Sequence, residues 1–433
     1  MRAAFPWFSK NALAMSAVAV LSVSVLAACS GNSGSSGSGG SGSSTSPGNS
    51  TGPITIGASL SLTGDFSADG QAFEKGYTLW VKDVNAHGGL LGRQVKLTVL
   101  NDDSSQNQVV TNYQTLLGAD HVDLTFGPFS SLLTAPASSV AARYGMAFVE
   151  GAGGAPAVFD TPSNQADHNV FDVSLPIADE LVPFVKWIAS LPPDRRPKTA
   201  AYPMAQDPFA DPPVQLAQTL LTELGVKTVY YQQPFTEEVA DYKAPADQVA
   251  ATGADLVVLG STDVPTVAAF MQAFEQQHYT PKLFIAASGP DQGTAFTSAV
   301  GVGNADGMMV PNGWYPGYAN ETSKNMVSEY VAAYGGNPSG VNADVAEAYS
   351  VGQVMAQAVT ATGGIDNAKI ISYLHSGVAL NSVQGQVKFD ALGENGAAAA
   401  FVFQWQQNNF NEVLPVGGRG ARPIIATKPA WTG

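Results

Sequence analysis

The chain has 433 residues, a length that leaves room for two or three domains. Hydrophobic residues make up 45% of it and charged residues 13%, a balance that supports a large buried core and argues against global disorder. The formal net charge of −15 argues against nucleic acid as a partner, and the single Cys excludes an internal disulfide bond.

The first residues have the pattern of an export signal. Residues 1–28 combine a positively charged start, an apolar stretch at 12–25 that is too short for a membrane span, and small residues at the end. The run Leu-Ala-Ala-Cys at 26–29 resembles the bacterial lipobox, which implies cleavage before Cys29 and diacylglyceryl transfer to it. The alternative is an ordinary signal peptide followed by a chance Cys. Residues 29–53 are expected to form the lipidated Cys and a flexible Ser/Gly tether that follows it.

From residue 54 onward, short apolar runs alternate with amphipathic stretches. We expect strands at 54–60, 95–99, 122–126 and 146–149, with helices at 70–85, 107–117 and 135–144. Strands that alternate with helices in this rhythm form parallel sheets covered on both faces.

A second series of the same kind begins after residues 173–176. Its helices are expected at 177–191, 214–224, 241–252 and 266–277, and its strands at 199–202, 228–231, 256–259 and 282–286. Helices at 345–360 and 367–374 follow, and then a strand pair formed by 386–389 and 401–406. The predicted fold class is therefore α/β, with two doubly wound parallel-sheet lobes and a hinge.

The loops at the carboxyl ends of these strands are the expected ligand-binding positions. They are rich in Gly, Ser, Thr and Asp, which allow close backbone approach and leave N–H groups free at helix starts. Such groups suit a carboxylate, whereas an ammonium group needs acids such as Asp207, Asp263 and Asp291. Any one of these residues has a simpler role as a cap or turn former, but the whole set predicts a ligand cleft.

Several motifs stand in a characteristic order. They include Leu-Thr-Gly at 62–64, Asn-Ala-His-Gly-Gly-Leu-Leu-Gly-Arg at 85–93, Gly-Pro-Phe-Ser-Ser at 127–131, Asp-Pro-Phe at 207–209, Asp-Tyr at 241–242 and Gly-Gln-Val-Lys-Phe-Asp at 385–390. In this order they resemble the type I, branched-chain amino-acid (leucine/isoleucine/valine) type of periplasmic binding protein, over nearly all of residues 54–420.

The resemblance implies a domain organisation and a set of partners. Lobe 1 is expected to comprise 54–173 plus 314–381, and lobe 2 to comprise 174–313 plus 382–425, with three crossings between them. The lobes are expected to close around a solute and to dock onto an ABC permease and its ATPase. The protein is expected to be a monomer that is exported and held at the outer face of the cytoplasmic membrane.

The resemblance also implies the site residues. Ser131 is expected to contact the ligand carboxylate, Ala152 and Gly154 to form the next loop, and Phe209 to form an aromatic wall. Further candidates are Thr262, Asp263, Ser288 and Asp291 in lobe 2, with Asp65 and Phe66 after the first strand. Gly154 replaces a usual Thr, and Ser288 replaces a usual acid. The sequence therefore leaves the chemical class of the ligand open. It is an amino acid, an aromatic or aliphatic carboxylate, an amide or a peptide-like molecule.

Other function classes find little support in the sequence. There is no zinc-protease, Walker A, paired CxxC or nucleophile-elbow motif, and the five His residues are scattered. The run Gly-Val-Gly at 301–303 reads as a loop. We therefore expect neither an enzyme nor a bound metal or cofactor. A lipid-anchored ligand sensor of the same fold is the main alternative.

Overall fold

A computed structural model describes residues 52–231, 234–235, 242–317, 320–418 and 421–432. They belong to one compact unit that spans Thr51–Gly433. Within the described part of the chain, no helix combines the length and the apolar character needed to cross a membrane. Cys29, the export signal and most of the tether lie outside the described residues, as does Asp241.

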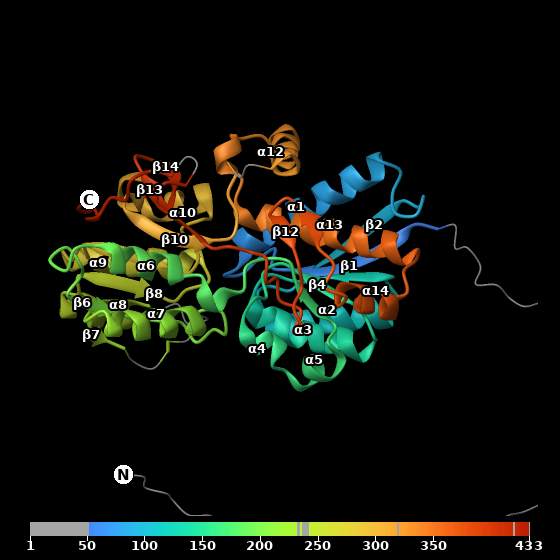
Figure 1. The fold of residues 1–433 in the computed structure, drawn as a ribbon, viewed down its shortest axis with the longest axis horizontal. Coiled ribbons are helices and arrows are strands. Elements are labelled where there is room, and N and C mark those ends of the chain that lie inside the picture. The colour runs from blue at the N-terminus through green and yellow to red at the C-terminus, as the bar shows by residue number, and fades with distance from the viewer. Residues whose placement is uncertain (1–51, 232–233, 236–241, 318–319, 419–420, 433) are drawn as a thin grey trace, which may run out of the picture. The chain divides into compact units, whose positions relative to one another are not determined.

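The first lobe is built on a five-stranded sheet of order β2-β1-β3-β4-β5, in which all neighbours are parallel. Its strands are β1 (Ile54–Leu60), β2 (Val95–Asn101), β3 (Leu124–Phe126), β4 (Phe148–Glu150) and β5 (Val170–Asp172). The connecting helices are α1 (Ser67–Ala86), α2 (Gln106–Gly118), α3 (Ser131–Arg143), α4 (Pro156–Phe159) and α5 (Pro162–Asp167). Later helices α13 (Ala343–Thr362) and α14 (Asn367–Leu374) pack on the same lobe (Figure 1).

The second lobe is built on a seven-stranded sheet of order β14-β13-β10-β9-β8-β6-β7. Its strands are β6 (Thr199–Ala201), β7 (Lys227–Tyr230), β8 (Leu256–Leu259), β9 (Leu283–Ala286), β10 (Met308–Asn312), β13 (Phe401–Gln406) and β14 (Asn409–Leu414). Helices η1 (Ile177–Asp179), α6 (Val182–Ser190), α7 (Asp211–Glu223), α8 (Lys243–Thr252), α9 (Val264–Gln276), α10 (Gly293–Val300) and α11 (Val302–Ala305) precede or join these strands. The expected fold of two parallel-sheet lobes is confirmed, with an antiparallel edge at β13 and β14.

The expected strand pair between 386–389 and 401–406 is wrong. β12 (Gly385–Val387) pairs instead with β11 (Leu380–Ser382), while β13 pairs with β10 and β14. The reason is burial in two different places, because Val387 and Phe389 enter the core of the first lobe and Trp405 enters the core of the second. The expected loop at 301–303 is also wrong, because α11 begins at Val302.

The chain passes between the two lobes in three segments, which lie between β5 and β6, after β10 and before β13. β10 ends at Asn312 in the second sheet, and Trp314 is already buried in the first core. Helix α12 (Glu321–Tyr334) and the short η2 (Pro338–Gly340) follow, and the buried face of α12 belongs to that same core. After β12, the backbone N–H of Asp172 donates to the carbonyl of Gly393, so this stretch runs beside β5.

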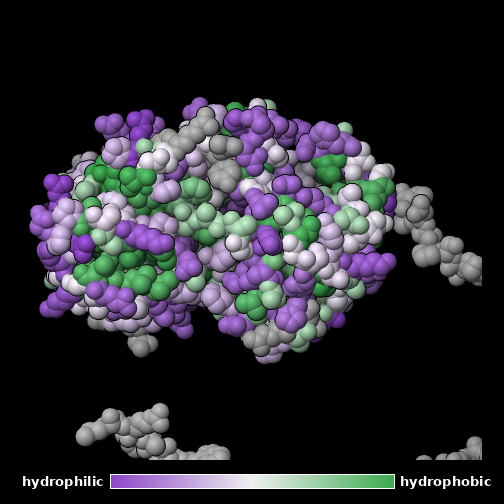
Figure 2. All heavy atoms as spheres, in the orientation of Figure 1, coloured by the Kyte–Doolittle hydropathy of each residue, from purple (hydrophilic) through white to green (hydrophobic). Residues whose placement is uncertain are grey.

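Each lobe has its own hydrophobic core. One cluster fills the first lobe around β1, β3 and β4, and two clusters lie on the two faces of the second sheet. β8 is buried along its whole length, as a central strand covered on both faces must be. Figure 2 shows that hydrophobic residues gather mainly on the second lobe on the face that is viewed, while hydrophilic residues are spread over both.

Candidate ligand-binding site

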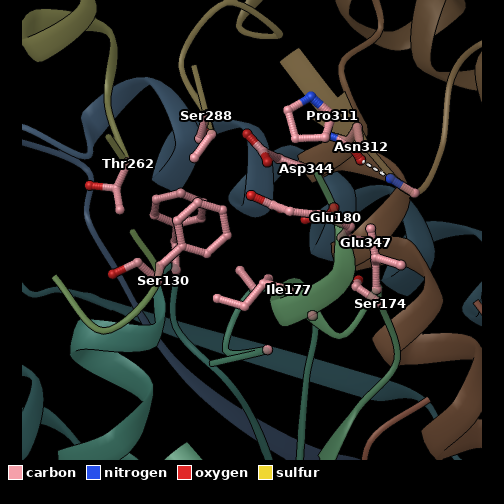
Figure 3. A pocket seen from close by; sticks show the side chains of 18 of the residues that line it. Ser130, Ser174, Ile177, Glu180, Thr262, Ser288, Pro311, Asn312, Asp344 and Glu347 are labelled. Carbon is pink, nitrogen blue, oxygen red and sulfur yellow. Dashed lines mark hydrogen bonds between the residues drawn. The ribbon is translucent and has the colours of Figure 1, made fainter. Parts of the chain in front are cut away.

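A cavity lies where the carboxyl ends of strands from both sheets meet. The space not filled by protein atoms amounts to about 600 Å³, part of it open solvent. The loops after β3, β4 and β5 supply one wall, and those after β6, β8, β9 and β10 supply the other. The start of α13 closes the remaining side through Asp344 and Glu347 (Figure 3).

Six of the expected site residues line this cavity. They are Ala152, Gly154, Phe209, Thr262, Ser288 and Asp291. Phe209 comes from the second lobe and also packs against the core of the first, so it spans the two walls. The strand-end rule thus brings together residues that lie far apart in the sequence.

Ser131 is placed next to the cavity but does not line it. Its Oγ accepts a hydrogen bond from the backbone N–H of Ala155 at 3.2 Å, and the residue is fully buried. The neighbouring Ser130 lines the cavity instead. Its Oγ is buried and has no hydrogen-bond partner among the described residues.

The other three expected residues also lie outside the lining. Asp263 caps α9, and its Oδ1 accepts from the backbone N–H of Thr266 at 2.7 Å. Asp65 is exposed. Phe66 is buried behind the wall, where its ring packs edge to face with that of Phe129, with the ring centroids 5.7 Å apart.

Four acidic residues that the sequence analysis did not single out line the cavity. They are Asp172 at the end of β5, Glu180 after η1, and Asp344 and Glu347 near the start of α13. The last two are three residues apart and therefore share a face of the helix. The signal available in the sequence was this i, i+3 pair following the cap residue Asn342, whose side chain accepts from the N–H of Val345.

Burial raises the pKa of all these carboxyl groups. The pKa of Asp172 rises from 3.8 to about 7, and that of Asp344 to about 8, with the charge of Asp291 as a second cause for Asp344. The pKa of Glu180 is raised mainly by burial and also by Asp291. The pKa of Glu347 is also raised mainly by burial, and then by the charges of Asp344 and Asp291.

Neutral donors hold two of the acids in place. The Nδ2 of Asn312 donates to Asp291 Oδ2 at 2.8 Å. The Nε2 of Gln292, which precedes α10 in the second lobe, donates to Asp344 Oδ2 at 2.7 Å. This second bond joins the two lobes beside the cavity.

The absence of a side chain at Gly154 leaves room for the carboxyl group of Asp172 at the cavity. A Cβ atom at position 154 would lie 2.8 Å from Asp172 Oδ2 and 2.9 Å from the carbonyl of Leu175. A side chain here would therefore displace the carboxylate. The Thr that the family resemblance implies at this position would occupy the space that the buried carboxyl group of Asp172 takes.

The described residues contain no cluster of three or more His, Cys, Asp or Glu side chains arranged to hold a metal ion. Together, the two lobes and the cavity between them define a two-lobed binding protein.

The chain belongs to the periplasmic binding protein family, whose model matches residues 53–410. Membership of this family confirms the expectation of a binding protein and not an enzyme. An amino acid binding protein of Pseudomonas aeruginosa PAO1 is 24% identical over 362 residues, which cover 84% of this chain and 92% of the relative.

Solved structures of the same fold agree with this assignment. The leucine binding protein LivK of Thermotoga maritima has a TM-score of 0.72 at 18% identity, covering 83% of this chain and 97% of LivK. A solute binding protein of an ABC transporter from R. palustris, in complex with benzoate, has a TM-score of 0.71 at 16% identity. The match covers 88% of this chain and 98% of that protein.

Proposed function

We propose that this protein is the solute-binding component of an ABC importer and holds an amino acid or a related small organic compound in the cavity between its lobes. The cavity carries this proposal, because both lobes contribute to its wall at the ends of their parallel strands. The names of the relatives, an amino acid binding protein and the leucine binding protein LivK, support the class of solute.

Binding between two lobes couples occupancy to shape. A solute that contacts both walls stabilises the closed arrangement, and a hinge motion then presents that arrangement to a partner. The expected lobe bounds were 54–173 with 314–381 and 174–313 with 382–425, and we propose these bounds with a change at the third crossing. Because Val383, Val387 and Phe389 are buried in the first core, we place the third crossing after Phe389, between there and β13.

We also propose that Cys29 carries the lipid anchor that keeps the protein at the outer face of the cytoplasmic membrane. The lipobox-like run before it and the Ser/Gly tether after it support this proposal. The variant Cys29→Ser is expected to leave the membrane fraction. A variant protein that still sediments with membranes would show that another segment holds it there.

The binding role is tested by blocking the cavity. Ser288 lines it and is half-buried, whereas Thr294 on α10 is exposed and outside the lining. In a melting-shift screen of amino acids, amides, amines and organic acids, the native protein is expected to gain stability with its solute by mass action. Ser288→Trp is expected to abolish that gain, and Thr294→Trp to retain it. The absence of any shift across the screen would count against the proposed function.

A further inference from the structure

The charge of the cavity is unusual for a site that is to hold an amino acid with one ammonium group. Five carboxylate residues line it: Asp172, Glu180, Asp291, Asp344 and Glu347. None of the described lining residues is Lys, Arg or His. The ion pairs found within the described residues all lie elsewhere, on the surfaces of the lobes.

Two of these carboxylates have oxygen atoms with no protein partner. Asp172 Oδ2 and Glu180 Oε1 are buried and accept no hydrogen bond from the described residues. The two residues are 0% and 3% exposed. Figure 3 shows Glu180 and Asp344 between Thr262 and Ser288 on one side and Ser174 and Ile177 on the other. Both residues line the cavity, so these unpartnered acceptors belong to its wall.

The donors that would hold a ligand carboxylate are partly occupied. Glu150, at the end of β4, accepts hydrogen bonds from the backbone N–H groups of Ala152 at 2.8 Å and Gly153 at 2.5 Å. These N–H groups belong to the loop that the family resemblance assigns to the carboxylate and the amine of the ligand. An acidic side chain of the protein thus takes the place of an acidic group of the solute.

Carboxylates removed from water need a compensating charge or a proton. An unpaired buried charge costs several kcal/mol, and like charges nearby add to that cost. The raised pKa values of Asp172 and Asp344 agree with this expectation. An organic cation in the cavity would supply that compensating charge in place of the protons.

Building on the proposed function, we propose that the solute is an organic cation with at least two amino or guanidino groups, held by Glu180, Asp172 and the acids of α13. Ammonium and guanidinium groups donate several hydrogen bonds each and pair strongly with carboxylates. Polyamines and basic amino acids share this chemistry. The five acids exceed what the single ammonium group of a neutral amino acid requires, and they repel a plain carboxylate such as benzoate.

Calorimetric titration of the protein with solutes of different charge tests the proposal. The cationic arm comprises putrescine, spermidine, agmatine, arginine and lysine, and the other arm comprises leucine, isoleucine, glutamate and benzoate. At least one cation is expected to bind at least about 100-fold more tightly than every solute of the other arm. Tight binding of the amines alone indicates a polyamine site, and tight binding of arginine or lysine indicates a basic amino-acid site.

Variants separate pairing with the cation from a general loss of fold. Glu180→Gln and Asp172→Asn keep the shape of the side chain and are each expected to weaken cation binding by about 10-fold or more, as expected for a charged hydrogen bond. Glu223→Gln, at an exposed position of α7, is the matched control and is expected to bind as the native protein does.

Three outcomes would overturn the proposal in different ways. If leucine, benzoate or another neutral or anionic solute binds and no cation does, the charge assignment is wrong while the binding role stands. If Glu180→Gln and Asp172→Asn both bind the cation with native affinity, the acids of the cavity are not its partners. If no solute of either arm binds, both this inference and the proposed function fail.

Discussion

At the scale of single residues, the site depends on which of two adjacent serines faces the cavity. Ser130 adopts an extended backbone before α3 and lines the cavity, while the next residue turns into the helix and bonds to the loop behind it. A sequence motif locates such a pair but does not decide between its members. That choice depends on where α3 begins.

The two serines are expected to respond differently to substitution. Ser130→Ala is expected to weaken solute binding by about 1–2 kcal/mol, because it removes a free hydroxyl from the wall. Ser131→Ala is expected to lower the free energy of unfolding by about 1 kcal/mol and to leave affinity nearly unchanged, because its Oγ bonds to Ala155. Calorimetry and denaturant unfolding of both variants make the comparison. The reverse pattern would show that Ser131 contacts the solute.

The raised pKa values of the buried acids predict how stability depends on pH. The folded state holds the protons of Asp172 and Asp344 more tightly than the unfolded chain does, because their pKa values are about 7 and about 8 when folded and near 3.8 otherwise. The stabilisation from these protons is complete below about pH 4 and is lost as the pH rises through about 7 to 8. Each group contributes at most about 1.4 kcal/mol per pH unit across that window.

We therefore expect the Tm of the unliganded protein to fall between about pH 5.5 and about pH 9. Asp344→Asn is expected to make this fall shallower, because the variant has no carboxyl group to ionise at that position. Asp194→Asn, at an exposed position, serves as the control and is expected to follow the native curve. Equal slopes for Asp344→Asn and the native protein would show that Asp344 does not titrate in this range.

At the scale of elements, α13 connects the core of the first lobe to the cavity. It packs along α1 where glycines allow close approach: a Cβ at Gly76 would lie 2.5 Å from the carbonyl of Val345, and one at Gly352 would lie 2.1 Å from the ring of Trp80. The N-terminal end of the same helix carries Asp344 and Glu347, which line the cavity. The position of these acids therefore depends on the packing of the whole helix.

This packing predicts a large effect from a small side chain. Gly352→Ala is expected to lower the free energy of unfolding by about 1–3 kcal/mol, because a rigid indole ring fills the space that the new methyl group needs. Gly340→Ala is the matched control, because a Cβ there meets nothing within 4 Å. Chemical unfolding measures both. A Gly352→Ala variant as stable as the control would show that α1 and α13 are packed less tightly.

The elements that the sequence predicted are those with a strong repeating pattern. β1 and β8 lie at the expected residues, 54–60 and 256–259, because β8 is a continuous apolar run and β1 alternates apolar residues with small or polar ones. β5 was missed because Val170–Asp172 is only three residues long and follows a polar stretch. The partner of β13 was misassigned because local pattern does not identify which distant strand completes an edge.

The site was predicted to a similar extent and for related reasons. The strand-end rule located Ala152, Gly154, Thr262, Ser288 and Asp291, since it depends only on topology. It did not identify Asp172 or Glu180, because Asp172 ends the missed strand and Glu180 follows a single 3-10 turn within an expected long helix. The acidic character of the cavity therefore emerges only when these segments are folded together.

At the scale of the whole described unit, polar contacts join the two lobes beside the cavity. Gln292 of the second lobe donates to Asp344 and accepts from the Nδ2 of Asn342 at 2.9 Å, both at the start of α13. Phe209 adds an apolar contact from the second lobe to the first core. These contacts and a solute seated next to them favour the same closed arrangement, so that occupancy and closure are coupled.

The most direct test of this account is a crystal structure of the protein grown with the solute that binds most tightly in the charge-sorted titration. The account predicts density for that solute between the lobes, with donor groups of the solute within hydrogen-bond distance of Glu180 and Asp172. A solute bound on an outer surface, or seated in the cavity with those two carboxylates turned away from it, would contradict the account.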